Sequence, residues 1–213
     1  GLAKKCRSSF EKAVALDSKN IAARMDLFEF YVQAPGIAGG GKDKAREQAA
    51  EIMKLDVVRG HLALAAMAMA TEEKDLKTAE AEYRAALTAE PKSARARVAL
   101  GNFLLNQKRF PEAKALFDEA LPDPKLSMIA HYQLGKVLLV SGTDLDAALA
   151  HFKTYLSAPP EPETPAWADA HWRIGLVYEK QGKKPEAIAE LKEALKLNPA
   201  HVQAKKDLKR LGG

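Results

Sequence analysis

The stretch ADAHWRIGLVYEKQGKKPEAIAELKEALKLNP, residues 168–199, decides the fold. Its apolar residues recur at helical spacing on both sides of a short glycine-containing turn, and Pro199 ends the second run. Gly175, Ala187 and Ala194 are small residues at the places where two helix backbones would cross. We therefore predict two amphipathic helices that pack closely against each other.

The same pattern recurs upstream, which predicts a repeat protein. The alanine that opens the second helix recurs at intervals of 40, 34 and 34 residues, as Ala187, Ala147, Ala113 and Ala79. The glycine of the first helix recurs as Gly175, Gly135 and Gly101, with Met67 in the remaining copy. Six extra residues in the 40-residue interval fall in the proline-rich spacer 159–165, which we interpret as a lengthened inter-repeat loop or a docking loop.

These matches resemble the tetratricopeptide repeat, whose period is 34 residues and whose pattern is Trp-x-x-Leu-Gly-x-x-Tyr, Ala-x-x-x-Phe, Ala and Pro. The last unit matches it at His171, Ile174, Gly175, Tyr178, Ala187, Leu191, Ala194 and Pro199. The family's first tryptophan is missing, and Trp172 lies one place later. The resemblance implies an all-α, right-handed superhelical solenoid of helix–turn–helix repeats with about twelve helices.

The register extends to both ends of the chain. We expect a half repeat at 1–19, repeats at 20–59, 60–93, 94–127, 128–167 and 168–201, and a capping helix at 202–213. The half repeat suggests a region cut from a larger protein, and self-association through its N-terminal end is the expectation that follows from the uncovered helix. The long loop 34–41 loosely resembles loops of bacterial family members, some of them exported.

Composition limits the classes of function. Hydrophobic residues make up 47% of the chain, and the net charge of +5 is spread over helices that also carry acidic residues. The sequence contains no apolar run of about 18 residues, so we predict no membrane span. No signal peptide is visible. Cys6, as the single cysteine, excludes an intrachain disulfide. The compartment stays open: cytoplasmic, or periplasmic or exported if a leader was removed.

Several motifs suggest chemistry but are better explained by packing. Residues 36–43, GIAGGGKD, nearly match a phosphate-binding loop, but Asp43 replaces the magnesium-binding hydroxyl and the segment before the loop has helical periodicity. His131 and His171 share one repeat position and are expected between helices. The basic residues 205–210 lack interleaved aromatics, so we predict no nucleic-acid binding. We assign no catalytic residue, no metal site and no cofactor.

The inner face of the first helices is where members of the resembled family bind peptides. That resemblance implies a partner-binding face with Met25, Glu29, Leu64, Arg95, Val98, Asn102, Asn106, Tyr132, Lys136, Trp172, Arg173 and Leu176. The fifth positions form an apolar stripe expected to be open to water and anchored by Tyr132 and Trp172, although these side chains could also cover one another. The lysine of the chaperone-binding clamp is replaced by Val98, which argues against chaperone-tail binding.

We therefore predict a non-catalytic protein-interaction scaffold that binds a peptide or a helix of a protein partner in a concave groove. The alternative is a region of a larger protein that positions a neighbouring domain or mediates self-association.

Overall fold

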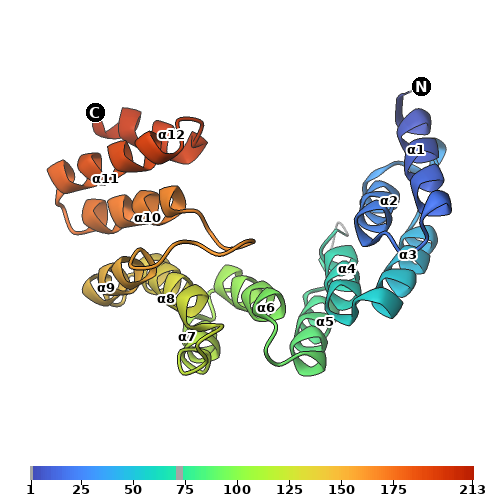
Figure 1. Ribbon diagram of the computed structural model, residues 1–213, viewed down its shortest axis with the longest axis horizontal. Coiled ribbons are helices and arrows are strands. Elements are labelled where there is room, and N and C mark those ends of the chain that lie inside the picture. Colours follow the sequence, from blue (N-terminus) through green and yellow to red (C-terminus); the bar gives the residue numbers. More distant parts are fainter. Residues whose placement is uncertain (1, 71–73) are drawn as a thin grey trace. The chain divides into compact units, whose positions relative to one another are not determined.

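The computed structural model describes residues 2–70 and 74–213, and these residues form helices and no strand (Figure 1). The helices of this part of the chain are α1 Leu2–Leu16, α2 Ile21–Gln33, the short 3-10 helix η1 Gly36–Ala38, α3 Lys42–Leu55, α4 Val57–Met69, α5 Leu76–Ala89, α6 Ala94–Asn106, α7 Phe110–Asp118, α8 Ser127–Ser141, α9 Leu145–Tyr155, α10 Trp167–Lys180, α11 Lys184–Leu197 and α12 Val202–Leu211. The predicted all-α repeat solenoid of about twelve helices is confirmed.

Two compact units divide the chain, residues 1–103 and 104–213, with the boundary inside α6. In the N-terminal unit each helix from α1 to α5 packs against the next, and α2 also lies against α4. One core cluster of this unit contains Leu27, Phe28, Tyr31, Ala45, Ala49, Ile52 and Ala63, and a second contains Val58, Ala86 and Ala96. Contact between alternate helices is what stacked helix pairs need to bury a continuous core.

The C-terminal unit follows the same rule. Neighbouring helices from α7 to α12 pack in order, and α8 lies against α10. Its main core cluster contains Tyr132, Leu138, Leu139, Ala148, Phe152, Tyr155, Ala170, Ile174 and Val177. A second cluster of Leu191, Ala194 and Ala204 holds α12 on α11, with Leu208 and Leu211 packed against it.

Acidic and amide side chains start several of the helices. Asn20, Asp56, Asp75 and Asp144 accept hydrogen bonds from the backbone N–H three residues later, at 2.8–3.0 Å. Each bond satisfies one of the N–H groups that the first turn of a helix leaves without a partner. These residues therefore explain why α2, α4, α5 and α9 begin where they do.

The glycines at the helix crossings allow the close approach that the sequence predicts. A Cβ atom at Gly135 would lie 2.9 Å from ring carbons of Phe152, and one at Gly175 would lie 3.1 Å from Leu191 Cγ. Both contacts join the first and second helices of one pair, α8 with α9 and α10 with α11. Backbone proximity, rather than backbone flexibility, is the reason for glycine at these two positions.

Gly60 gives a testable case in the N-terminal unit. A Cβ there would lie 2.5 Å from the Met53 Cα, so α3 and α4 would have to separate. Alanine improves helix propensity by about 1 kcal/mol, but overpacking against backbone costs more. We expect Gly60→Ala to lower the free energy of unfolding by about 2 kcal/mol net in urea titrations followed by circular dichroism. Gly36→Ala, which meets nothing within 4 Å, should be close to neutral.

The loop between α2 and α3 is ordered by its own backbone. Gly41 N–H donates to Tyr31 C=O at 2.9 Å, Gly39 N–H donates to Gly36 C=O at 2.8 Å, and Gly39 has a left-handed φ of 93°. The loop follows helix α2, whereas a phosphate-binding loop follows a strand. It therefore serves as a connection between two helices, with the side chain of Ile37 93% exposed at its tip.

The proline-rich spacer between α9 and α10 is attached to the unit at both ends. Tyr155 Oη donates to Pro165 C=O at 2.5 Å, and Trp167 Nε1 donates to Ala158 C=O at 3.0 Å. These bonds satisfy backbone carbonyls that proline-rich segments cannot pair within a helix. The spacer is thus a lengthened loop with defined anchors.

Candidate partner-binding site

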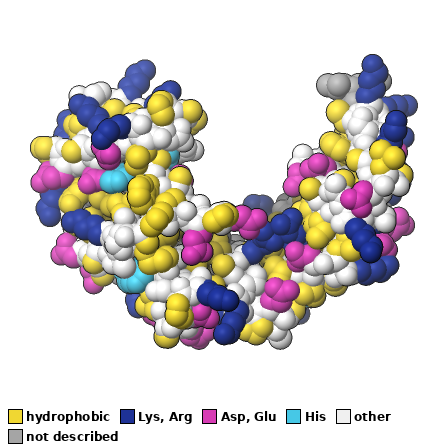
Figure 2. Space-filling model, in the orientation of Figure 1, with side chains coloured by type: hydrophobic (Ala, Val, Ile, Leu, Met, Phe, Trp, Pro, Cys, Tyr) yellow, Lys and Arg dark blue, Asp and Glu magenta, His cyan; other side chains and the backbone are white. Residues whose placement is uncertain are grey.

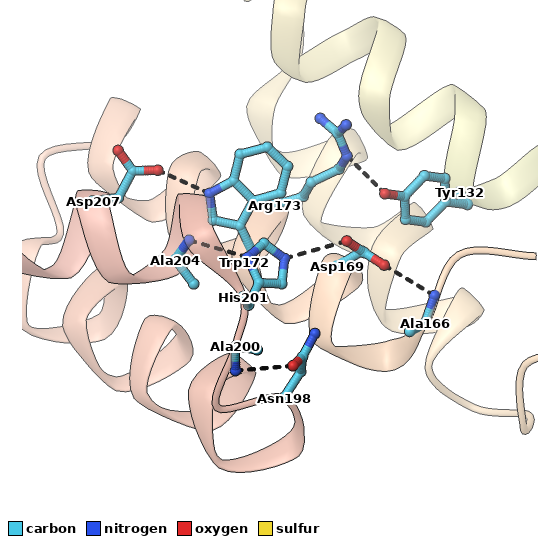
Figure 3. Close-up of polar contacts among 10 residues, drawn as sticks. All are labelled: Tyr132, Ala166, Asp169, Trp172, Arg173, Asn198, Ala200, His201, Ala204 and Asp207. Atoms are coloured by element: carbon cyan, nitrogen blue, oxygen red, sulfur yellow. Dashed lines mark hydrogen bonds and ion pairs between the residues drawn. The ribbon is translucent and has the colours of Figure 1, made fainter. Parts of the chain in front are cut away.

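Four of the predicted binding residues come together in the C-terminal unit. Tyr132 and Lys136 lie one turn apart on α8, and Trp172 and Arg173 are adjacent on α10. Arg173 Nε donates to Tyr132 Oη at 2.8 Å (Figure 3). The guanidinium carbon lies 4.8 Å from the Trp172 ring centroid and 5.6 Å from that of Tyr132. Contact between α8 and α10 therefore produces an aromatic and cationic cluster.

Tyr132 is less exposed than the sequence predicts. Only 4% of this residue is exposed, so the expectation that it is open to water is wrong. Its ring meets those of Phe152 and Tyr155 edge-on, at centroid distances of 5.6 and 5.1 Å. Burial raises the pKa of its hydroxyl, and the charge of Arg173 opposes that rise. The ring of Tyr132 therefore belongs to the core, and its hydroxyl contacts Arg173.

Lys136 adds a second positive charge beside Arg173. Burial lowers the pKa of its ammonium group to about 8, and the neighbouring charge of Arg173 lowers it further in the same direction. A lysine in this setting can change protonation near neutral pH, unlike a fully solvated one. The cluster therefore carries positive charge at neutral pH.

Trp172 contacts the last helix, α12, and the sequence did not predict this contact. Trp172 Nε1 donates to Asp207 Oδ2 at 2.8 Å, and its ring lies 5.5 Å from that of His201 (Figure 3). His201 Nδ1 accepts from Ala204 N–H at 3.1 Å, and its Nε2 lies 3.2 Å from Asp169 Oδ1. The capping helix therefore also orients a predicted binding residue.

The basic residues of α12 are partly used inside the fold. Arg210 pairs with Glu179 of α10 and donates to Asp207 Oδ1 at 3.0 Å. The space-filling view shows Lys and Arg side chains interleaved with Asp and Glu over the surface in view, with no continuous basic stripe (Figure 2).

The remaining predicted binding residues vary in exposure. Glu29 and Asn106 are exposed, whereas Met25, Leu64, Arg95, Val98, Asn102 and Leu176 are half-buried. Met25 and Leu64 pack against the core of the N-terminal unit, and Leu176 packs against that of the C-terminal unit. Arg95 lies 3.9 Å from the carboxylate of Asp56. Many of these side chains are thus partly used in packing.

Histidines join the two helices of a pair, as predicted for His131 and His171. His131 Nδ1 lies 2.8 Å from His151 Nδ1, joining α8 to α9. His171 Nδ1 lies 2.6 Å from Glu190 Oε2, joining α10 to α11. The predicted placement of both residues between helices is confirmed. Each histidine makes a polar contact there in addition to filling space.

A third pair shows that α4 follows a different register. His61 Nδ1 lies 2.7 Å from Glu82 Oε2, which repeats the pairing of His171 with Glu190. The interval from the histidine to the alanine opening the second helix is 18 residues here and 16 in the C-terminal pair. Two additional residues between the histidine and that alanine explain the difference.

This register changes which residues of α4 correspond to the site. Leu62, rather than Leu64, becomes the counterpart of Trp172. The small residue at the glycine position becomes Ala65, which is fully buried, rather than Met67. Aligning the repeats at a constant spacing could not detect this two-residue shift of α4. The recurrence of a histidine and a glutamate, as in His61 and Glu82, is the sequence signal that could have suggested it.

The His131–His151 pair predicts a loss of stability in acid. Burial lowers the pKa of both imidazoles below the usual value near 6.5, and mutual repulsion lowers that of His151 further, modified by Asp118, Lys114 and Asp144. Protons then bind the unfolded chain more readily, so unfolding becomes easier as pH falls through about 6.5 to the folded values.

Urea unfolding at pH 7.5 and 5.5 checks this expectation. The wild-type chain should lose more free energy of unfolding between the two pH values than the variant His151→Phe. An equal loss in both would show that the pair does not carry the pH dependence.

The described residues provide no evidence for a metal centre or a membrane span. Among residues 2–70 and 74–213, no group of three or more His, Cys, Asp or Glu side chains is placed to hold a metal ion. No helix in this part of the chain combines the length and apolar character needed to cross a bilayer.

Stacked helix pairs with close small-residue crossings define the chain as an all-α helical-repeat protein. Two family models described as tetratricopeptide repeat match it, over residues 70–134 and 168–201. The chain is a tetratricopeptide repeat protein, as predicted. Proteins of this family generally act as non-enzymatic scaffolds that bind protein or peptide partners. A search of curated protein sequences gives no significant match.

Solved structures with the same fold agree with this assignment. YrrB, described as a TPR protein with an unusual peptide-binding site, is 20% identical with a TM-score of 0.54, covering 94% of this chain and 97% of YrrB. A tetratricopeptide repeat protein from Parabacteroides merdae is 17% identical with a TM-score of 0.66, covering 100% and 79%. PilW, a type IV pilus biogenesis factor, is 19% identical with a TM-score of 0.60, covering 97% and 90%.

Proposed function

We propose that this chain is a non-catalytic scaffold that binds an extended peptide or a helix of a partner protein along the first helices of its repeats. The observation that carries the proposal is the cluster of Lys136, Trp172 and Arg173, which presents half-buried aromatic and cationic groups on adjacent first helices. Residues of this kind dominate binding energy at protein interfaces.

The proposed contact surface extends the cluster along the first helices. Each unit has its own part of this surface: Met25, Glu29, Arg95, Val98 and Asn102 in the N-terminal unit, where Leu62 takes the place on α4 that constant spacing gives to Leu64, and Asn106 and Leu176 in the C-terminal unit, where buried Tyr132 lies beneath the surface. The repeat boundaries given by the sequence remain part of this proposal. The fold shared with YrrB, a TPR protein described as having an unusual peptide-binding site, supports such a use.

Charge substitutions at exposed positions test the surface without disturbing the core. Peptides selected against the wild-type chain by display should bind more weakly to Glu29→Lys or Asn106→Lys, two exposed positions on first helices. Glu47→Lys, which makes the same change at an exposed position of the second helix α3, serves as the matched control. Equal effects of Glu29→Lys and Glu47→Lys would contradict binding along the first helices.

A second candidate function is self-association or the positioning of a neighbouring domain. Leu16, at the end of α1, is 80% exposed, although Phe10 on the same helix is half-buried against the core. Static light scattering should give a mass above the 23.2 kDa monomer if this end self-associates, and Leu16→Glu should restore the monomer. A concentration-independent monomer mass would exclude self-association.

A further inference from the structure

The proline-rich spacer between α9 and α10 presents most of its prolines to solvent. Pro159, Pro160 and Pro162 are exposed, whereas Pro165 is half-buried where the chain approaches α10. Figure 1 shows the spacer reaching beyond the ends of the two helices that it joins. Three of its prolines therefore form surface of the C-terminal unit rather than part of its core.

The covalent geometry of proline restricts the backbone of this segment. A proline ring fixes φ near −65°, and the residue before a proline is pushed to the extended region. Residues 158, 159 and 161 each precede a proline, and residues 159–161 belong to no helix or turn. This combination favours the polyproline II conformation over residues 158–162, a left-handed helix with three residues per turn.

A tight turn ends the extended segment. Thr164 N–H donates to Glu161 C=O at 3.1 Å, and Thr164 Oγ1 donates to the same carbonyl at 2.6 Å. Glu163, the third residue of the turn, has a left-handed φ of 65°. A proline at the second place and a positive φ at the third define a type II turn, whose second residue has φ and ψ close to those of polyproline II. Pro162 therefore continues the extended segment, and the chain reverses after it.

The loop is fixed at both ends as well as at the turn. Tyr155 Oη donates to Pro165 C=O, and Trp167 Nε1 donates to Ala158 C=O. A partner that binds such a loop loses little affinity to the ordering of a flexible chain. The left-handed φ of Glu163 is strained for a residue other than glycine, and a strained conformation kept at an exposed place is an observation from which a role in recognition can be inferred.

The spacing of the prolines gives the loop one side that a partner can read. Pro159 and Pro162 are three residues apart, which places their rings on the same side of a polyproline II segment, while Pro160 lies on another side. Grooves lined with aromatic rings bind prolines at this Pro-x-x-Pro spacing. Glu161 and Glu163 are exposed and add negative charge to the loop. A complementary groove therefore combines Trp or Tyr rings with a neighbouring Lys or Arg.

We propose that the loop 158–165 is itself a ligand, and that it binds a partner protein domain whose aromatic-lined groove accepts Pro159 and Pro162 and whose basic side chain meets Glu161. In this interaction the chain supplies the bound segment, whereas along its first helices it receives one. The two proposals use different surfaces, so this inference does not rest on the proposed function.

Binding to SH3, WW and EVH1 domains, three classes that read proline-rich segments, tests the inference. Arrayed recombinant domains are probed with the fluorescently labelled chain, and the strongest pair is measured by isothermal titration calorimetry. We expect binding to domains whose groove carries a lysine or an arginine. The double variant Pro159→Ala, Pro162→Ala should raise the Kd at least about tenfold.

Matched variants separate the proline side from a general effect on the loop. Pro160→Ala makes the same chemical change on another side of the segment and should raise the Kd by less than about threefold. Glu161→Lys should weaken binding more than Glu161→Gln, because it reverses the charge instead of removing it. Glu29→Lys, on a first helix of the N-terminal unit, should leave this binding unchanged.

Relaxation of backbone ¹⁵N nuclei checks the fixed shape of the loop without a partner. The amides of Glu161 and Glu163 should have order parameters close to about 0.85, the value of rigid backbone. Values below about 0.6 would overturn the proposal, because a mobile loop has no fixed proline side to offer.

The binding outcomes are equally decisive. Absence of binding to every arrayed domain, equal losses in Pro160→Ala and the double proline variant, or a loss in Glu29→Lys as large as that in the double variant would each overturn the proposal. None of these results bears on peptide display against the first helices, so the scaffold function stands or falls separately.

Discussion

Replacing Phe152 with alanine is expected to lower the free energy of unfolding of the C-terminal unit by about 3–5 kcal/mol. The side chain of Phe152 is 0% exposed and packs between α8 and α9, where the neighbouring Gly135 has no side chain to close a cavity. Urea unfolding followed by tryptophan fluorescence measures the loss, because Trp167 and Trp172 both lie in this unit. Phe152→Leu should cost less than half as much.

The contact with Gly135 gives an internal control. Gly135→Ala places a Cβ 2.9 Å from the Phe152 ring and should destabilise by about 1–3 kcal/mol alone. In the Phe152→Leu background the same change should cost less, because the smaller side chain leaves room. Strict additivity of the two losses would show that the glycine is needed for another reason.

The fold was predictable because packing between two helices imposes a short-range rule. Gly135 and Gly175 recur at one position because Phe152 and Leu191 occupy the space where their Cβ atoms would lie. Such a rule leaves a periodic signal in the sequence. A local insertion breaks the period, which explains why constant spacing places Met67, rather than Ala65, at the glycine position of α4, whereas the His61–Glu82 contact fixes the register.

The candidate site was predicted less well, since its geometry depends on contacts between helix pairs. The pattern placed Tyr132, Trp172 and Arg173 on first helices, but not the burial of Tyr132 under the Arg173 guanidinium. The contacts of Trp172 with His201 and Asp207 come from a helix that carries no family pattern of its own. Repeat position therefore predicts the helix face, whereas neighbouring side chains decide which groups remain available.

Tyr132 explains why a stability control is needed in any binding experiment at this site. Tyr132→Ala would remove a ring packed on Phe152 and Tyr155 and should lower the free energy of unfolding by about 3–5 kcal/mol. Lost binding in that variant would report on the fold, so it cannot measure the contribution of the ring to partner recognition. Urea unfolding followed by tryptophan fluorescence checks the expected loss of stability.

Tyr132→Phe keeps the packing and removes only the acceptor of Arg173 Nε. We expect a stability loss of about 0.5–1.5 kcal/mol together with a more mobile guanidinium. Slower exchange of the Arg173 Hε proton in wild type than in the variant, measured by nuclear magnetic resonance, would show that the hydroxyl holds the side chain in place. Equal exchange would mean that stacking on Trp172 is sufficient to hold the guanidinium in place.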